Sequence, residues 1–513
     1  MNSPGMTILT RRAALIGAAA LPLLGRPAHA ARTPGVLRFG LSAYPPTLAP
    51  WANAGTAAGT TQALMNRGLT GYAADGSLTG ELAESWTREG EATWVFKLRE
   101  ARWHNGKSVE SEHIKWNFDQ IAGEKSTAYL RAQCQDIAEI ETPDARTIKL
   151  VMKAPNATIP LMLATYFMPM VFPGSVTAAV PQGIGAGPFV LKSAERGVSL
   201  ELEANAAYYK PGLPKLKGIR LIAYADETLR VAALQSGDLD LIEYVPWQSM
   251  GAIETDPRLV LQTTEGPFMF MMFNGKAGPM ADKRVRQAMA HAIKRDEVVK
   301  AAFFGRGSPL EGVPMVKSSP FFDAARSRGQ AYDPARAKAL LTEAGYPNGF
   351  SATLLSTATY GMHKDTAEIV QQNLAAVGIQ VELKLPDWAT RVAQGNRGQY
   401  EFAIMGSGAE SNDPDGVTNQ IDGSLSNAYG RSINLPTPRI HDLLAQGRAE
   451  FDPKKRQAIY AEVERAVLDE ANFVGIAWRA QGYAFTRDLK GFQNLPGALT
   501  FFSGTTLDQA EFG

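Results

Sequence analysis

The sequence predicts an α/β protein with mixed β-sheets and more than one domain. Segments with strand periodicity alternate with segments whose helix ends are marked by capping residues, and this alternation is typical of α/β folds. The chain has 513 residues, which is two to three ordinary domain lengths. Its composition, 45% hydrophobic and 20% charged, is that of a globular protein able to bury large cores.

The first part of the expected fold is β-rich. A strand is predicted at Val36–Gly40, just before the proline-rich turn at Pro45–Leu48. The segments Trp86–Lys97 and Thr147–Met152 are apolar or alternate between apolar and polar residues, with turn glycines such as Gly90 between apolar stretches. These patterns predict strands joined by tight turns.

Helices with clear ends come next. Asp226 is predicted to cap a helix that Gly237 terminates. Asp333-Pro334 and Asp452-Pro453 each place an N-cap before a proline at the first helical position, which is the preferred order at a helix start.

Helices with marked ends and strands also alternate in the second half of the chain. A helix over residues 365–377 is predicted to end at Gly378 and to lead into a strand over residues 379–385. No low-complexity linker divides the chain, so we expect its parts to be joined by more than one crossing strand.

Residues 1–30 predict an export signal. Arg11-Arg12 precede a weakly hydrophobic run, and Ala28-His29-Ala30 matches an A-x-A cleavage pattern. Paired arginines before a modestly hydrophobic segment are typical of the twin-arginine route. Cleavage after Ala30 would release the mature protein into the bacterial periplasm.

Charge and cysteine content argue against several classes of protein. Without the three arginines of the signal, 49 basic residues face 51 acidic residues, so no basic field attracts nucleic acid or anionic lipid. Cys134 is the sole cysteine and lies far from the cleavage point, so neither a lipid anchor nor an intramolecular disulfide is expected. The apolar run over residues 159–172 contains two prolines and is too short to span a membrane.

Three motifs in the chain have simpler interpretations than the chemistry they suggest. Gly183–Pro188 resembles a nucleotide-binding loop, but a strand pattern follows it instead of a helix, so a backbone crossover is predicted. The five mature histidines never fall at metal-ligand spacing. Residues 411–422 have the spacing of an EF-hand loop but lack its first Asp and last Glu, so Asp413 and Asp415 are expected to form turns.

Seven fragments, in order along the chain, resemble the solute-binding proteins of peptide, opine and nickel ABC importers, known as solute-binding family 5. The resemblance covers roughly residues 36–492. The fragments are Pro46-Thr47-Leu48-Ala49-Pro50, Gly80-Glu81-Leu82-Ala83-Glu84-Ser85-Trp86, Phe96-Lys97-Leu98-Arg99, Trp103-His104-Asn105-Gly106-Lys107, Gly185-Ala186-Gly187-Pro188-Phe189, Ala233-Leu234-Gln235-Ser236-Gly237-Asp238-Leu239-Asp240 and Asp282-Lys283-Arg284-Val285-Arg286-Gln287-Ala288.

The resemblance implies a two-lobed periplasmic-binding-protein fold, type II-like and of cluster C, with mixed sheets and an extra subdomain. We expect lobe I to consist of residues 31–52, 186–268 and 485–513, its subdomain to be residues 53–185, and lobe II to be residues 269–484. Hinge motion is expected where strands cross between the lobes, near residues 268–274 and 483–487.

The loop Gly406–Pro414 is similar, without gaps, to the family's "G-W-x-A-D-Y-x-D-P". In that pattern the acidic residue grips the α-amino group of a bound peptide, and here it is Glu410. Ser407 and Gly408 are expected in the ligand-binding loop as well. Ser407 replaces the family's Trp and Ser411 its Tyr, so the pocket should be wider or take a different ligand.

Two further ligand-binding residues are implied by the same resemblance. Trp388 stands where relatives place an aromatic wall against the ligand, and His363, expected just before the helix over residues 365–377, resembles the residue that approaches a peptide carboxylate. Each also has an ordinary interpretation, Trp388 as core and His363 as a capping or surface residue. Ile404 occupies a position that carries Arg in some oligopeptide binders, which weakens the case for an ordinary linear peptide.

The resemblance therefore predicts the solute-binding component of an ABC importer, which binds its ligand without catalysis and uses no cofactor or metal. The expected ligand is a di- or oligopeptide or another amine-bearing compound, passed to permease subunits by a monomer with no nucleic-acid partner and no membrane anchor. One alternative keeps the role but changes the ligand to an opine, a sugar or a metal chelate. Another is a secreted hydrolase that uses two separated carboxylates as acid and base.

Overall fold

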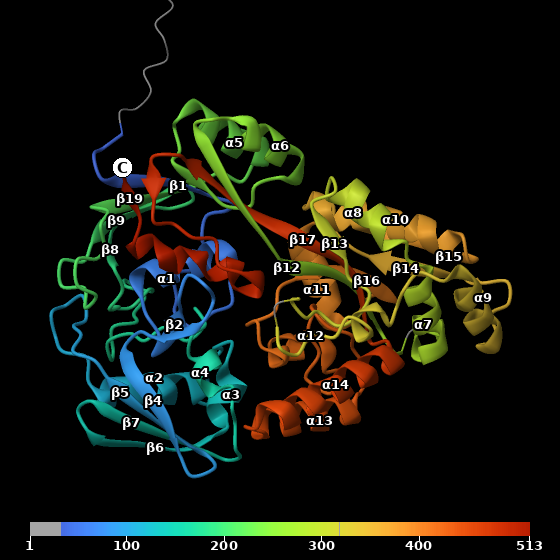
Figure 1. Cartoon of the computed structure of the whole chain (residues 1–513), viewed down its shortest axis with the longest axis horizontal. Helices are drawn as coiled ribbons and strands as arrows, with labels where there is room; N and C mark the ends of the chain where they lie inside the picture. The colour runs from blue at the N-terminus through green and yellow to red at the C-terminus, as the bar shows by residue number, and fades with distance from the viewer. Residues whose placement is uncertain (1–31, 277, 318) are drawn as a thin grey trace, which may run out of the picture.

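The computed structural model describes residues 32–276, 278–317 and 319–513. Figure 1 shows two lobes side by side, one coloured blue to green and the other mostly yellow to orange. We call the part built around β1, β8–β10 and a separate four-stranded sheet the first lobe, and the part built around β13–β16 the second lobe. The predicted signal peptide and its cleavage site lie outside the described residues.

One mixed sheet of 11 strands runs through both lobes, in the order β15-β14-β16-β12-β17-β11-β1-β10-β9-β8, with β13 paired to β17. Parallel pairs, such as β1 with β10 and β14 with β15, occur beside antiparallel pairs, which confirms the predicted α/β class with mixed sheets. The strands are β1 (Val36–Leu41), β8 (Phe189–Glu195), β9 (Ser199–Ala204), β10 (Gly218–Ala223), β11 (Leu241–Ile242), β12 (Leu259–Phe273), β13 (Gly307–Pro309), β14 (Phe350–Leu355), β15 (Ile379–Lys384), β16 (Phe402–Ser407) and β17 (Phe473–Thr486).

Two long strands, β12 and β17, join the lobes (Figure 1). They pair antiparallel along most of their length, but their register shifts between Glu265 and Phe268. Gly266 lies in this shift, and a Cβ there would fall 2.0 Å from the backbone of Gly497, so the close approach requires glycine. The expected hinge over residues 268–274 starts beside this interruption, and the hinge itself stays a prediction.

The first lobe holds the smaller sheets. The four-stranded sheet has the order β4-β5-β7-β6, with its own buried core around Phe96, Trp103 and Phe118. Gly90, at φ 62°, turns the chain between β4 and β5, which together replace the single segment Trp86–Lys97 read from the sequence. The strands are β2 (Thr70–Tyr72) with β3 (Leu78–Gly80), β4 (Ala83–Glu89), β5 (Thr93–Leu98), β6 (Ile137–Asp144) and β7 (Thr147–Met152), and β18 (Leu489–Lys490) with β19 (Glu511–Phe512).

The helices begin where the capping residues predict. Asp226, Asp333 and Asp452 each accept a hydrogen bond from a backbone N–H of the first turn. The helices are α1 (Thr56–Met65), α2 (Ser111–Ala122), α3 (Arg131–Gln135), α4 (Ile159–Met162), α5 (Glu227–Ser236), α6 (Trp247–Thr255), α7 (Lys283–Ala292), α8 (Arg295–Ala302), α9 (Pro334–Glu343), α10 (Gly361–Ala375), α11 (Trp388–Arg397), α12 (Thr418–Ile421), α13 (Pro438–Ala449) and α14 (Pro453–Glu470), with 3₁₀ segments η1 (Gly278–Ala281), η2 (Arg326–Arg328), η3 (Pro414–Val417) and η4 (Gly497–Asp508).

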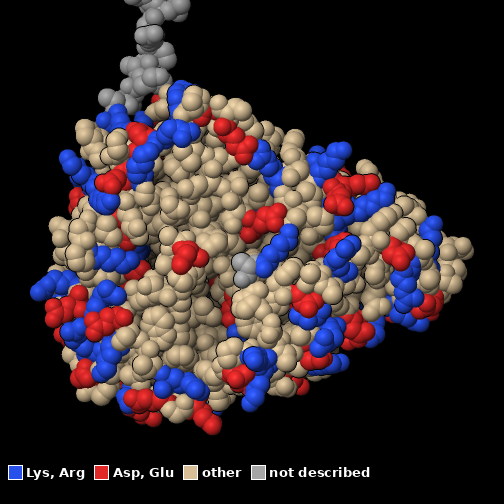
Figure 2. Space-filling model, viewed as in Figure 1, with Lys and Arg blue, Asp and Glu red and all other residues tan. Residues whose placement is uncertain are grey.

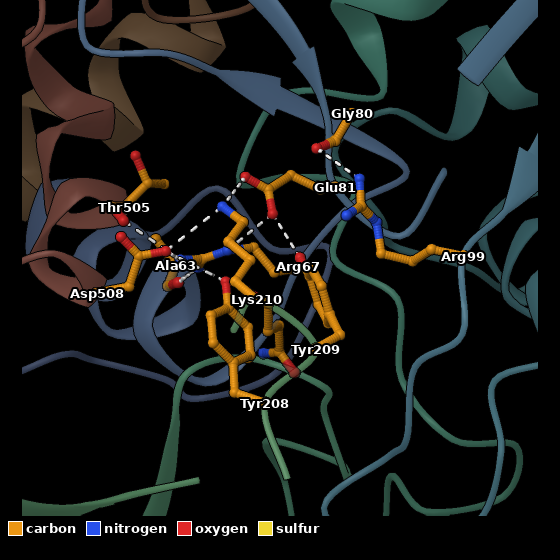
Figure 3. A network of polar contacts seen from close by, with 12 residues as sticks. Ala63, Arg67, Gly80, Glu81, Arg99, Tyr208, Tyr209, Lys210, Thr505 and Asp508 are labelled. Carbon is orange, nitrogen blue, oxygen red and sulfur yellow. Dashed lines mark hydrogen bonds and ion pairs between the residues drawn. The ribbon is translucent and has the colours of Figure 1, made fainter. Parts of the chain in front are cut away.

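A buried network of charges ties η4 to the rest of the first lobe (Figure 3). Arg67 lies 3.4 Å from Glu81 and 3.3 Å from Asp508, and Lys210 lies 2.9 Å and 3.4 Å from the same two carboxylates. Tyr208 and Tyr209 donate hydrogen bonds to Asp508 and Glu81. Burial alone would raise the pKa of Glu81, but the two cations and Tyr209 hold it below its ordinary value.

On the molecular surface, charges of both signs are interspersed. Figure 2 shows Lys and Arg next to Asp and Glu over much of the viewed face. None of the helices in the described part of the chain is both long and apolar enough to cross a bilayer.

Candidate ligand-binding site

The segment that leaves β16 brings three of the predicted residues to the boundary between the lobes. Ser407, Gly408 and Glu410 are each half-buried there. Ser407 Oγ accepts a hydrogen bond from Gln420 Nε2 at 3.1 Å. A Cβ on Gly408 would lie 2.9 Å from the ring of Phe501, so a side chain at this position would push against the first lobe.

Glu410 makes a contact across the cleft. Its Oε1 accepts hydrogen bonds from Tyr129 Oη of the first lobe at 2.6 Å and from Asn419 Nδ2 at 2.5 Å. Within the described part of the chain, Oε2 has no hydrogen-bond partner. Burial raises the pKa of Glu410, although both donors favour its charged form. The carboxylate is therefore held in place by one oxygen while the other is free.

The remaining acids of this loop have structural partners. Asp413 makes two hydrogen bonds to Arg456, at 2.6 and 2.7 Å, and caps η3 by accepting from the N–H of Asp415. Asp415 in turn pairs with Arg448 at 3.1 Å. These contacts confirm the turn-forming role expected of both residues. Among residues 32–276, 278–317 and 319–513, no group of three His, Cys, Asp or Glu side chains is placed to hold a metal ion.

His363 lies in the first turn of α10, because that helix starts at Gly361 and not at Asp365 as predicted. Its side chain is buried, with only 2% of the residue exposed, so the alternative of a surface residue is wrong. Burial, followed by the charges of Arg391 and Arg479, lowers the pKa of His363 to about 3, and the ring is therefore neutral. Its Nδ1 has no hydrogen-bond partner in the part of the chain that the structure describes.

Trp388 is the first residue of α11 and forms part of an aromatic wall. Asp387, which caps the helix, sets its position. Its ring is half-buried and packs edge-on against Tyr360, His363 and Tyr429 at 5.4–5.9 Å between centroids. His363 also approaches the loop, because a Cβ on Gly406 would lie 3.2 Å from its Nε2. The five predicted residues thus surround the carboxyl end of β16.

Sequence reasoning missed four residues that share this region. Tyr129 reaches Glu410 from 281 positions away, which no local pattern could reveal. Tyr244 has φ 48°, an uncommon backbone conformation for a bulky residue, and stacks on Phe501. Arg391, one turn after Trp388, and Arg479, a charge inside an apolar strand, did carry a signal, since a charged residue in such a pattern is seldom buried without purpose.

A cavity of ≈ 250 Å³ adjoins Glu410 between the lobes. Its first-lobe wall includes Asn156, Thr158 and Thr165, and its second-lobe wall includes Glu410, Thr418 and Asn419. The lobes also touch at its edge, where the N–H of Ala157 donates to the carbonyl of Arg448 at 2.7 Å. The site is therefore a polar interlobe chamber with an aromatic wall nearby, suited to enclosing a small solute.

This fold and site define a class: a two-lobed binding protein that holds a small solute between its lobes. Residues 77–429 match the family model described as "Bacterial extracellular solute-binding proteins, family 5 Middle", and the chain belongs to this family. The resemblance read from the sequence is thereby confirmed, as is the two-lobed fold.

Known relatives support the same assignment. The chain is 27% identical over 450 residues to the glutathione-binding protein GsiB of Escherichia coli (strain K12), covering 84% of this chain and 86% of that protein. The PBP AgaA from A. tumefacien R10, solved in complex with agropinic acid, is 36% identical with a TM-score of 0.86, covering 93% of this chain and 99% of that one. DppA from Helicobacter pylori, solved with the peptide STSA, is 20% identical with a TM-score of 0.82, covering 94% and 98%.

The protein is thus the solute-binding component of an ABC importer. Members of the family are periplasmic, bind small ligands or peptides and deliver them to ABC permeases. The family is one of transport proteins and not a class of enzymes, so the hydrolase alternative has no support in these comparisons.

Proposed function

We propose that this chain captures a small, amine-bearing, amino-acid-derived solute between its lobes, with Glu410 as the anchor for the amine. The observation that carries the proposal is the arrangement of the Glu410 carboxylate. Glu410 lines the interlobe cavity, one of its oxygens is held by Tyr129 and Asn419, and Oε2 has no partner in the described part of the chain.

The chemistry favours a cationic ligand group. Burial destabilises the charged form of Glu410 and raises its pKa. An ammonium group at Oε2 would stabilise that charge through a charge-assisted hydrogen bond, which is about twice as strong as a neutral one. The contact from Tyr129 would then couple ligand binding to closure, because Tyr129 belongs to the opposite lobe.

An opine is the favoured ligand within this class. AgaA, solved with agropinic acid, is the only one of the structural relatives described above that exceeds 25% identity. The small side chains of Ser407 and Ser411, and Ile404 in place of an arginine, also depart from the pattern of oligopeptide binders. A di- or oligopeptide is the second candidate, in line with the glutathione-binding relative.

The organisation of the mature protein completes the proposal. We infer that export by the twin-arginine route ends with cleavage after Ala30 and yields an unanchored monomer. In this monomer, lobe I consists of residues 31–52, 186–268 and 485–513, its subdomain of residues 53–185, and lobe II of residues 269–484. N-terminal sequencing and light scattering of the exported protein test these points.

A thermal-shift screen tests the ligand assignment. Mature protein, stripped of bound solute by reversible unfolding, is mixed with agropinic acid, mannopinic acid, glutathione, Met-Leu, mannitol and Ni(L-His)2. A solute that binds the folded state raises the melting temperature by mass action. Glu410→Gln should lose the shift given by the amine-bearing solute, whereas Glu91→Gln, an exposed acid, should keep it.

Two results would contradict the assignment. If mannitol or Ni(L-His)2 alone stabilises the protein, the ligand class is wrong. If an amine-bearing solute stabilises Glu410→Gln as strongly as the unaltered protein, Glu410 is not the anchor. Binding of the amine should also weaken on acidification through the raised pKa of Glu410, since the protonated carboxyl carries no charge.

A further inference from the structure

The deeply buried arginines of this protein fall into two groups. Arg230, Arg286 and Arg295 are each at most 2% exposed, and each donates hydrogen bonds to at least three backbone carbonyls. Arg391 and Arg479 are equally buried but far less well satisfied. The first group is explained by its structural role, and the second is not.

Arg391 lies in the wall formed with Trp388. It is 0% exposed, and among the described residues its guanidinium donates only to the carbonyls of Tyr429, at 2.8 Å, and Ile404, at 3.2 Å. The rings of Trp388 and Tyr429 lie 5.8 Å from its Cζ. Its Nε has no hydrogen-bond partner.

Arg479 lies on β17, in the segment that joins the lobes. It is 2% exposed, its Nη1 donates a hydrogen bond to Gln481 Oε1 at 3.3 Å, and its guanidinium also hydrogen-bonds the phenol of Tyr244. Its Nε has no partner among the described residues. Within the described residues, neither Arg479 nor Arg391 forms an ion pair with a carboxylate. The charge of each guanidinium is left without a counter-charge.

Contacts connect Arg479 to the ligand-binding loop. The phenol of Tyr244 interacts with Arg479, and the ring of Tyr244 stacks on Phe501 with 6.0 Å between centroids. The ring of Phe501 in turn lies against Gly408. Arg479 is thus linked to the loop after β16 through two residues of the first lobe, and both arginines are close enough to lower the pKa of His363.

A charge buried without a partner is costly, since a guanidinium taken out of water needs either a counter-ion or a full set of acceptors. We propose that Arg479 and Arg391 form an anion subsite for a carboxylate of the solute, with Arg479 in contact with it and Arg391 adding positive charge behind the aromatic wall. This inference rests on the proposed function and adds that the ligand carries a carboxylate as well as its amine.

A carboxylate fits because the planar guanidinium presents parallel N–H donors that match its two oxygens. With Glu410 at one end and Arg479 at the other, a zwitterionic amino-acid derivative would satisfy both unpaired charges. His363 Nδ1 is a further unpartnered polar atom beside the pair.

The test compares Arg479→Gln with Arg220→Gln, an exposed arginine of β10 that pairs with Glu201. The first probe is sodium acetate, titrated against sodium chloride and sodium sulfate at equal ionic strength, with the melting temperature as the readout. Acetate should stabilise the unaltered protein and Arg220→Gln more than chloride does, and should give no such excess with Arg479→Gln. An equal effect on all three proteins, or an excess with sulfate but not acetate, overturns the carboxylate subsite.

The second probe is a solute identified by the screen, together with its carboxamide. Loss of one partner of a buried charge pair costs about 2–5 kcal/mol, so Arg479→Gln should bind the acid at least about 30-fold more weakly. The carboxamide should bind the unaltered protein and the variant equally, which a general folding defect would not produce. If acid and carboxamide bind the unaltered protein equally well, the inference fails while the proposed function stands; if only solutes without an amine bind, the proposed function fails.

Discussion

The protein buries positive charge in two regions, and only one of them contains the matching negative charge. In the first lobe, Arg67 and Lys210 face Glu81 and Asp508 within 3.4 Å, and all four take part in one network (Figure 3). In the cleft, Arg391 and Arg479 are more deeply buried, yet their polar partners are carbonyls and a tyrosine phenol. The comparison separates charge that is neutralised within the fold from charge that, in our proposal, a carboxylate of the solute neutralises.

The largest expected effect comes from breaking the compensated network. Glu81→Gln leaves Arg67 and Lys210 with a single carboxylate, and removal of one partner from a buried ion pair typically costs about 3–5 kcal/mol. Urea unfolding should show this loss with or without solute. Glu201→Gln, which removes an exposed pair with Arg220, should cost less than about 1 kcal/mol; equal losses for the two variants would contradict a structural role for the network.

Removal of the buried charge of Arg479, which has no counter-charge among the described residues, should change the free energy of unfolding in the opposite direction. Arg479→Met removes this charge, so the ligand-free protein should gain about 1–2 kcal/mol, within the range found when buried charges are replaced by apolar residues. Urea unfolding of protein stripped of solute measures the change. A loss of 3 kcal/mol or more would mean that Arg479 is structural, like Arg67.

The smallest effect concerns His363, whose pKa is lowered by burial and by the two arginines. Its folded-state pKa of about 3 lies below the ordinary value of 6.5. Between these two pH values, His363 is protonated in the unfolded chain and neutral in the folded one. Stability should therefore fall as the pH drops below 6.5, by about 1 kcal/mol between pH 6.5 and 5.5. His363→Gln should lack this contribution and His291→Gln should keep it; identical pH profiles for His363→Gln and the unaltered protein would refute it.

Much of the fold could be read from local signals. Asp226, Asp333 and Asp452 each place a side-chain oxygen at the first turn of a helix, and this chemistry needs no distant partner. The start of α10 was misplaced because no side chain caps it: Tyr360 precedes the first turn, and the position of that turn depends on packing, including the bond from Ser356 Oγ to the carbonyl of His363.

The candidate site was only half predictable. The loop that carries Glu410 is contiguous, so a gapless motif located it. Arg479 did stand out as a charge inside an apolar strand, but its contact with Tyr244 of the other lobe and its lack of a counter-charge are properties of three-dimensional packing that no single sequence displays. The same holds for Tyr129, whose distance from Glu410 in the chain hides their contact.

The interruption in the β12–β17 ladder has a mechanical consequence. Points near the axis of a rotation travel little, whereas points at its rim travel far. If the lobes turn about the step between Glu265 and Phe268, Arg479, one residue from Phe268's partner Trp478, stays almost stationary while Tyr129 swings toward Glu410. The acidic end of a solute would then dock first, deep in an open molecule, and its amine would be enclosed last.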